Sequence, residues 1–285
     1  MQVSAERPEP ALYLVATPIG AARDITLRAL DVLNTADVLA AEDTRNLRHL
    51  MDIHGIAVRG RRMVSYHDHN AERARPAILA ALNEGLSVAY ASDAGTPLVA
   101  DPGYRLARDV AEAGHAVRAL PGPSAALAGL SVSGLPSDRF LFVGFPPAAA
   151  GARRKWIQSW VQVEATVIAF ESPKRVRQLL ENICEIEANR PIVICRELTK
   201  KFEEVMRGGA AELLDRIPEE GLRGEVVVLF GHPEPREVGE EDLRAALAGL
   251  ASLPVKEAAA QVASRFGLPR RDVYALAVEM REDRE

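Results

Sequence analysis

Short apolar segments alternate with helical patterns along most of the chain, and this alternation constrains the fold more than any other feature. The first apolar segment, 12–16, ends at Thr17-Pro18-Ile19-Gly20, and a helical pattern with Leu27, Leu30 and Leu33 on one face follows. Further strands that end in polar residues and precede helices are predicted at 38–41, 63–66 and 86–90. Strands separated by helices form mainly parallel sheets, so the sequence predicts an α/β fold.

The second half of the chain repeats this alternation. Strands are expected at 140–145, 166–170, 192–196 and 226–230, and helices at 173–186 and 210–217, whereas a strand at 116–120 still belongs to the first half. A Pro-, Ala- and Gly-rich stretch at 146–151 and a polar stretch from His232 indicate boundaries. We therefore expect a flexible tail at 1–10, α/β domains at 11–135 and 136–231, a linker at 232–240 and a helical extension at 241–285.

Composition excludes several classes of protein. With 285 residues, 48% of them hydrophobic, the chain is long enough to form substantial cores. No apolar run approaches the roughly 20 residues that cross a bilayer, and 1–10 does not resemble a signal peptide, so we expect no membrane association and a cytoplasmic location. Cys184 and Cys195 lack metal-binding spacing and are expected to be reduced core residues. The net charge of -5 argues against a general nucleic-acid coat but allows a local basic face.

Polar residues gather where the predicted strands end. They are Thr17-Pro18, Glu42 to Arg45, His67 to Asn70, Ser92 to Thr96, Ser124, Glu171 to Arg175 and Arg196 to Lys200. The carboxyl ends of parallel strands lie along one edge of a sheet, so these residues are expected to converge on one cleft. Small residues at 94–95 let a ligand approach the main chain, and Asp93 and Asp101 offer acceptors.

Familiar catalytic motifs are absent from the chain. It has no GxSxG, HExxH, Walker or GxGxxG sequence, which disfavours nucleophilic and metalloenzyme chemistry. His67 and His69 have no evident third ligand, so no metal is expected. Near the C-terminus, helical patterns on either side of Gly267 suit a helix-turn-helix. Residues 251–285 carry six basic and six acidic residues, so a helical dimer or a packing lid is an equal interpretation.

Several of these segments, in unbroken order, resemble one family. They are Val15 to Gly20 with Asp24-Ile25-Thr26, Glu42 to Arg45, Tyr66 to Asn70, Ser92 to Pro97, Asp101-Pro102-Gly103, Pro121 to Ala125, Phe170 to Pro173 and Arg196 to Lys200. The chain resembles the RsmI family of bacterial 16S rRNA ribose 2'-O-methyltransferases, within the tetrapyrrole (corrin/porphyrin) methylase superfamily. The resemblance covers 12–231 and extends to the C-terminal helices.

The resemblance implies two α/β domains with S-adenosylmethionine in the cleft between them, a helix-turn-helix-like extension and a homodimer. The implied reaction is methyl transfer to a cytidine ribose in the decoding region of 16S rRNA. By motif, the cofactor would be lined by Pro18, Ser92, Asp93, Ala94, Gly95, Thr96, Leu98, Val99, Ser124 and Ala125, with Phe145 and Glu225-Val226-Val227 closing over it. The residues expected to face the RNA are Arg45, His67, Lys174, Arg175, Arg196, Glu197 and Lys200.

The chemistry needs alignment of the nucleophile and removal of one proton, because a sulfonium methyl is already activated. Candidates for the general base are Glu42, Asp43, Glu171, Glu197 and Lys200. We expect Glu171 and Lys200 to affect turnover more than cofactor affinity. One alternative function is a tetrapyrrole C-methyltransferase of the same superfamily, and another is a catalytically silent RNA-binding or assembly factor.

Overall fold

The structure is a computed structural model that describes residues 6–67, 69–100, 104–233 and 239–282. The chain divides into two compact units, Met1–Pro233 and Glu234–Glu285. Asp68, the Asp101-Pro102-Gly103 segment and most of the expected linker lie outside the described residues. The boundaries predicted at 135/136 and 231/232 stay predictions.

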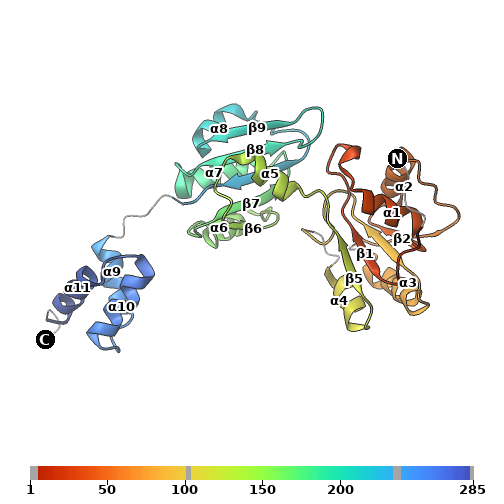
Figure 1. Ribbon diagram of the computed structural model, residues 1–285. Helices are drawn as coiled ribbons and strands as arrows, with labels where there is room; N and C mark the ends of the chain where they lie inside the picture. Colours follow the sequence, from red (N-terminus) through yellow and green to blue (C-terminus); the bar gives the residue numbers. More distant parts are fainter. Residues whose placement is uncertain (1–5, 68, 101–103, 234–238, 283–285) are drawn as a thin grey trace. The chain divides into compact units, whose positions relative to one another are not determined.

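A parallel five-stranded sheet forms the first part of the larger unit (Figure 1). Its strands are β1 (Leu12–Val15), β2 (Val38–Ala41), β3 (Arg62–Ser65), β4 (Val88–Ala91) and β5 (Val117–Leu120). They lie in the order β3-β2-β4-β1-β5, and every pairing is parallel. The strand alternation in the first half of the sequence thus predicted the sheet correctly. All five carboxyl ends share one edge, where the polar loops begin.

Helices cover both faces of this sheet. They are the 3-10 helix η1 (Ala22–Asp24), α1 (Leu27–Thr35), α2 (Thr44–Ile53), α3 (Ala71–Asn83) and α4 (Tyr104–Glu112). α1 and α2 pack on one face through Leu33 and Met51, and α3 and α4 pack on the other through Ile78 and Leu106. Successive strand residues point to opposite faces, so each strand contributes to both cores.

The buried face of α1 differs from the expected one. Leu30 and Leu33 are buried, whereas Leu27 is 58% exposed. Leu27 is the first residue of α1, directly after its cap Thr26, whose side chain accepts a hydrogen bond from the Ala29 N–H. The expectation that Leu27 shares the buried face was therefore wrong, because the helical period does not say where a helix first contacts the sheet.

The second sheet of the larger unit is mixed. Its strands are β6 (Phe140–Phe142), β7 (Thr166–Glu171), β8 (Ile192–Arg196), β9 (Glu204–Gly208) and β10 (Val226–Phe230), in the order β6-β7-β10-β8-β9. β6 and β7 are parallel, whereas β10 is antiparallel to both β7 and β8, and β9 is antiparallel to β8. β9 was not expected from the sequence. β6 is shorter than expected because Gly144, with φ +69°, interrupts the extended backbone.

The antiparallel β10 brings three strand ends to one edge. Both β7 and β8 run opposite to β10, so they run parallel to each other and end where β10 begins. Glu171, at the end of β7, and Arg196, at the end of β8, are both in register with Val226. Polar strand ends therefore still converge here, although the sheet is not parallel.

Four helices pack on the second sheet, and α5 joins it to the first. They are α5 (Ala125–Ser133), α6 (Ala150–Gln158), α7 (Val176–Glu187) and α8 (Ala210–Arg216). α6, α7 and α8 share a core on one face, and α5 packs on the other through Ala126 and Leu130. α5 follows β5 of the first sheet, yet Figure 1 shows it against the second. A Cβ atom at Gly129 would lie 3.2 Å from Val227 Cγ1, so α5 packs closely on β10.

The smaller unit contains three helices with their own core among its described residues. They are α9 (Glu240–Ala248), α10 (Val255–Phe266) and α11 (Arg270–Glu282). Leu247, Val262 and Val273 are buried together. Gly267 ends α10 in the left-handed conformation, with φ +65°, which is the turn expected between the last two helices. No helix in the described part of the chain is long and apolar enough to cross a membrane.

We predict that Leu33→Ala lowers the free energy of unfolding by about 2–5 kcal/mol, because it leaves a cavity beneath α1. Leu27→Ala, on the same helix, should change it by less than about 0.5 kcal/mol. Denaturant unfolding followed by circular dichroism measures both. Equal losses would contradict the assigned buried face.

Candidate active site

The loop after β4 is fixed to the loop after β1. Thr17 and Gly95 exchange two backbone hydrogen bonds, each 3.0 Å long. The buried Thr17 hydroxyl donates to the Ser92 carbonyl at 3.0 Å, and the Ser92 hydroxyl donates to the Gly95 carbonyl at 2.7 Å. Gly95 has φ +78°, a conformation that glycine adopts without strain. These bonds hold the small residues of the loop in one backbone conformation.

The loop after β5 joins the same assembly and leads into α5. The Thr96 hydroxyl donates to the Pro123 carbonyl at 3.0 Å. A Cβ atom at Gly122 would lie 2.8 Å from Ala16 Cβ, so the loop after β5 directly contacts the loop after β1. The Ser124 side chain caps α5 by accepting a hydrogen bond from the Leu127 N–H.

The loop after β1 also contacts the second sheet. A Cβ atom at Gly20 would lie 2.6 Å from Thr199 Oγ1 and 2.9 Å from the Leu198 carbonyl oxygen. The Ala21 N–H donates to Thr199 Oγ1 at 3.0 Å. Ile19 is buried in a cluster that includes Leu198, Cys195 and Val227. This contact closes one side of the space between the two sheets.

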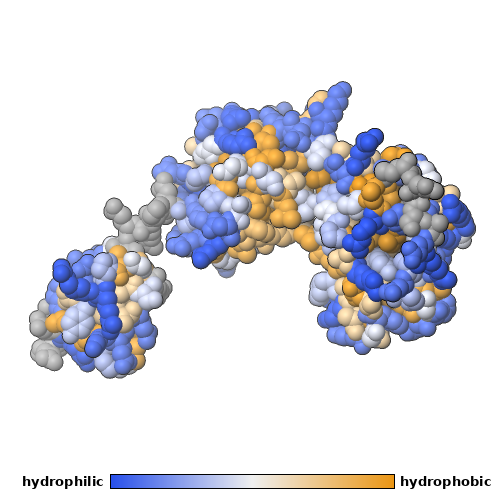
Figure 2. Space-filling view, in the orientation of Figure 1, coloured by the Kyte–Doolittle hydropathy of each residue, from blue (hydrophilic) through white to orange (hydrophobic). Residues whose placement is uncertain are grey.

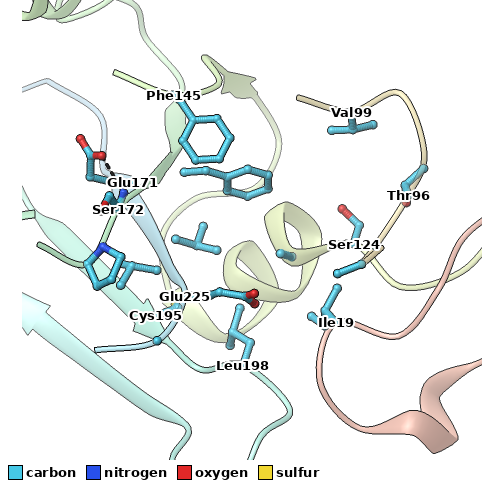
Figure 3. Close-up of a pocket in the computed structure, with 18 of the residues that line it drawn as sticks. Ile19, Thr96, Val99, Ser124, Phe145, Glu171, Ser172, Cys195, Leu198 and Glu225 are labelled. Atoms are coloured by element: carbon cyan, nitrogen blue, oxygen red, sulfur yellow. Dashed lines mark hydrogen bonds between the residues drawn. The ribbon is translucent and has the colours of Figure 1, made fainter. Parts of the chain in front are cut away.

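The register of the second sheet sorts its residues between two faces. Phe170 and Cys195 are both in register with Val227, and all three belong to the cluster on the α5 face. Glu171 comes one residue later in β7, so its side chain points to the opposite face. Its Oε1 atom accepts a hydrogen bond from the Ser172 N–H at 2.6 Å and forms an ion pair with Arg175 Nη2, also at 2.6 Å. In Figure 3 its carboxylate points away from the middle of the cavity.

A cavity of about 490 Å³ lies among these loops and strand ends (Figure 3). The first sheet's loops and α5 contribute Ile19, Ala94, Gly95, Thr96, Val99, Ser124 and Ala125. The second sheet contributes Phe145, Phe170, Glu171, Ser172, Pro173, Arg175, Cys195, Leu198, Gly224, Glu225, Val226 and Val227. The lining is mostly apolar or small, with a few polar groups at the rim. This size and lining are typical of sites that enclose a small organic ligand.

A second cavity of about 480 Å³ shares part of this wall. The shared residues are Ala94, Thr96, Val99, Phe145 and Phe170, and the second cavity adds Glu42, His67, His69, Ser92 and Ala100. The His67 N–H donates to Asn70 Oδ1 at 2.9 Å, which fixes the loop after β3. Among the described residues, no group of three or more His, Cys, Asp or Glu is arranged to hold a metal ion.

A charged network stands beside the first cavity. Lys200 Nζ donates to Glu197 Oε1 and to Glu225 Oε2, each at 3.0 Å. Glu197 Oε1 also accepts the Glu225 N–H at 2.9 Å, which ties β8 to β10. Partial burial lowers the pKa of Lys200, but the bonds to the two carboxylates outweigh it and raise that pKa overall. The bond from Lys200 and the Glu225 N–H lower the pKa of Glu197.

Comparison with known protein families identifies both units of the chain. Residues 11–214 match the family described as Tetrapyrrole (Corrin/Porphyrin) Methylases. The chain belongs to the tetrapyrrole methylase family. Residues 237–281 match the RsmI C-terminal HTH domain, which confirms the resemblance drawn from the motifs.

The protein is similar to relatives that cover nearly its whole length. It is 45% identical to "Ribosomal RNA small subunit methyltransferase I" of Mesorhizobium japonicum, over 99% of this chain and 96% of the relative. It is 42% identical to the protein of the same name from Escherichia coli O157:H7, over 97% of each. Among solved structures, a uroporphyrin-III C-methyltransferase from Thermus thermophilus complexed with S-adenyl homocysteine matches with a TM-score of 0.54 and 18% identity. That match covers 78% of this chain and 97% of that one.

The first cavity is lined by most of the residues that the motifs suggested for cofactor binding. They are Ala94, Gly95, Thr96, Val99, Ser124, Ala125, Phe145 and Glu225. Pro18 and Asp93 line a separate hollow beside α2. Ser92 lines that hollow and the second cavity, and it fixes the loop through Gly95. Leu98 packs on the core of the first sheet, with φ +70°.

The residues suggested for catalysis and RNA contact are more scattered. Glu42 and His67 line the second cavity. Asp43 caps α2 and pairs with Arg45, and the bonds from the Arg45 side chain and N–H lower the pKa of Asp43 to about 2. Lys174 is exposed and lines neither cavity. Arg196 pairs across strands with Glu204 at 3.1 Å.

Several residues that line the first cavity were given no role from the sequence. They are Ile19, Phe170, Ser172, Pro173, Cys195, Leu198 and Gly224. Ser172, Pro173 and Leu198 nevertheless lie in segments that were expected to converge on the cleft. Side chains alternate between two faces along a strand, so Phe170 lies on one face of β7 and Cys195 on one face of β8. Knowing that both face the cavity requires the antiparallel register of β10, which the apolar pattern alone does not give.

We predict that Gly20→Ala lowers the free energy of unfolding by about 1–3 kcal/mol, because the added methyl group meets Leu198 and Thr199. Gly151→Ala is the matched control, since no atom lies within 4 Å of its added Cβ. It should leave stability unchanged or raise it by less than about 1 kcal/mol. Denaturant unfolding distinguishes them, and an unchanged Gly20→Ala variant would show that the two loops are not in contact.

We predict that Lys200→Met destabilises the protein by about 1–2 kcal/mol near pH 7, because Glu197 loses its cation. Because folding lowers the pKa of Glu197, this residue stabilises the protein at pH values above the ordinary glutamate pKa of 4.5. That stabilisation is lost as the pH falls below 4.5 and through the lowered pKa. The raised pKa of Lys200 gives stability that is present below 10.5 and is lost above it. The difference in free energy of unfolding between wild type and Lys200→Met, measured from pH 3 to 11, should therefore become smaller at both ends of this pH range. If this difference did not depend on pH, the stabilisation would not come from the ion pairs of Lys200 with Glu197 and Glu225.

Proposed function

We propose that the protein transfers a methyl group from S-adenosylmethionine to the ribose 2'-hydroxyl of a cytidine in the decoding region of 16S rRNA. The observation that supports this most strongly is the 45% identity, over 99% of the chain, to a protein named for methylation of small-subunit ribosomal RNA. The identity includes the C-terminal helices. The tetrapyrrole C-methyltransferase alternative has weaker support, because the uroporphyrin-III enzyme is 18% identical and covers 78% of this chain.

The first cavity suits the proposed cofactor in size and lining. Its volume falls within the range of sites for ligands of this size. Gly95 and the alanines at 94 and 125 let a ligand approach the main chain, and the N-terminus of α5 at Ser124 favours a carboxylate. Phe170 and Val227 would pack against apolar parts. When bound, S-adenosylmethionine supplies a methyl group that its sulfonium has already activated.

The chain itself must orient the ribose and accept the proton of its hydroxyl. Among the candidate bases, Glu42 lines the cavity that adjoins the cofactor site. Asp43, with a pKa of about 2, is a weak proton acceptor. The raised pKa of Lys200 keeps it a cation. Glu171 lines the first cavity, but its carboxylate accepts the Ser172 N–H, pairs with Arg175 and points to the opposite face of the second sheet. Glu197 is paired with Lys200, and the bond from Lys200 lowers the pKa of Glu197. We therefore assign the base to Glu42, and positioning roles to Glu171 and Lys200.

Glu42→Gln should lower kcat by about 10²–10⁴-fold, because the amide cannot accept the proton. The affinity for S-adenosylhomocysteine should stay within about twofold, since Glu42 does not line the first cavity. Glu112→Gln, on the exposed surface of α4, is the control and should keep full activity. Single-turnover methylation and calorimetry measure the two quantities. Full turnover by Glu42→Gln would exclude Glu42 as the base.

The test of the function is methyl transfer from labelled S-adenosylmethionine to small ribosomal subunits from a strain that lacks this protein. We expect label on one ribose 2'-oxygen of 16S rRNA, located by nuclease mapping. Absence of label on subunits and on naked rRNA, with cofactor binding intact, would exclude the proposal. Label on a tetrapyrrole instead would favour the alternative.

We also propose that the protein is a cytoplasmic homodimer. α5 buries Ala126 and Leu130 yet exposes Leu127 and Val132, so it is apolar on more than its packed face. Figure 2 shows apolar surface gathered over the second sheet, near α5. Surfaces of this kind are commonly covered in dimers. Sedimentation equilibrium would give twice the 30.9 kDa chain mass for a dimer, and the chain mass would contradict it.

A further inference from the structure

Phe145 is a large apolar side chain fixed in an exposed position. Its ring is 54% exposed. The Phe170 N–H donates to the Gly144 carbonyl at 3.0 Å, which ties the backbone next to Phe145 to β7. The Phe145 and Phe170 rings meet edge to face, with centroids 5.7 Å apart. Figure 3 shows Phe145 at the margin of the first cavity, across from Val99. An exposed ring held in this way is suited to stack on a flat ligand.

Phe145 lines both cavities, so its ligand need not be the cofactor. The second cavity is about as large as the first, and both contain Thr96 and Val99. A group in the second cavity would therefore adjoin a methyl donor in the first. This is the relation that a nucleophile and a methyl donor require.

The side chains of the second cavity suit a nucleoside better than a phosphate. Glu42, His67 and His69 supply hydrogen-bonding groups, and no Lys or Arg occurs among the described residues that line it. A phosphate would lack a cation there and would be repelled by the carboxylate. His69 also lines a neighbouring groove of about 650 Å³ that contains Arg73, Arg75 and Arg105. Phosphates that flank a nucleoside would find cations in that groove.

We infer that the second cavity receives the target nucleoside turned out of the RNA, with its base stacked on Phe145. The inference rests on the proposed function and assigns the substrate to a particular part of the site. Proteins that recognise unpaired RNA bases commonly stack them on aromatic side chains. Phe145 is thus a substrate-positioning residue, although the motifs had suggested it for the cofactor.

Phe145→Ala should raise KM for small ribosomal subunits roughly 5- to 150-fold, the value of one base–aromatic stack. kcat should change little, because stacking acts equally on the bound substrate and on the transition state. Phe145→Tyr keeps a ring and should restore KM to within about threefold of wild type. Calorimetry with S-adenosylhomocysteine should give unchanged affinity for all variants.

Phe140→Ala is the matched control. Phe140 begins β6, five residues before Phe145, is 48% exposed and lines neither cavity. Its removal should leave KM unchanged. If wild type methylates subunits but Phe145→Ala keeps its KM, or loses cofactor affinity instead, the inference is overturned and the proposed function stands. If wild type does not methylate subunits, the proposed function falls and takes the inference with it.

Discussion

The cleft depends on the direct packing of the loop after β1 on the loop after β8. Gly20 leaves no room for a side chain against Leu198 and Thr199, and the Ala21 N–H bonds to the Thr199 hydroxyl. Glu197 and Thr199 both have positive φ, at +52° and +64°. Such backbone is costly for residues with a side chain and persists where surrounding contacts require it. The strain of the second loop is thus offset by contacts that join the two sheets.

The antiparallel strand β10, in the middle of the second sheet, decides which residues of that sheet face the cleft. It places Phe170, Val227 and Cys195 in one row on the α5 face. The next row, with Glu171 and Arg196, points toward the other core. Burial raises the pKa of the Cys195 thiol to about 11, so this residue acts in the row as an apolar group. The floor of the cleft is therefore uncharged, and charges lie at its margins.

The loops of the site could be predicted because they combine strand ends with residues of special conformation. Thr17 and Gly95 belong to segments that apolar runs and turn residues marked clearly, and the parallel direction of the strands in the first sheet followed from the alternation of strands and helices. The partners of α5 could not be predicted. Its sequence is apolar on several sides, so no periodic face indicated that Ala126 and Leu130 pack on the second sheet. β9 was also missed, because Glu204 and Arg207 leave only two apolar residues between them, too few to resemble a buried strand.

The arginines that the motifs suggested for RNA contact all form ion pairs, which bears on selectivity. Arg45, Arg175 and Arg196 are paired with Asp43, Glu171 and Glu204. A phosphate that approaches them must displace a carboxylate that is already in place. For the exposed Arg45 this costs little, because ion pairs at the surface are screened by water and contribute little to stability. The exchange costs more at Arg175, whose partner carboxylate is fully buried and would lose its cation. Because these arginines are already paired with carboxylates, they attract polyanions in general less strongly. Selectivity then depends on contacts that only the correct substrate can make.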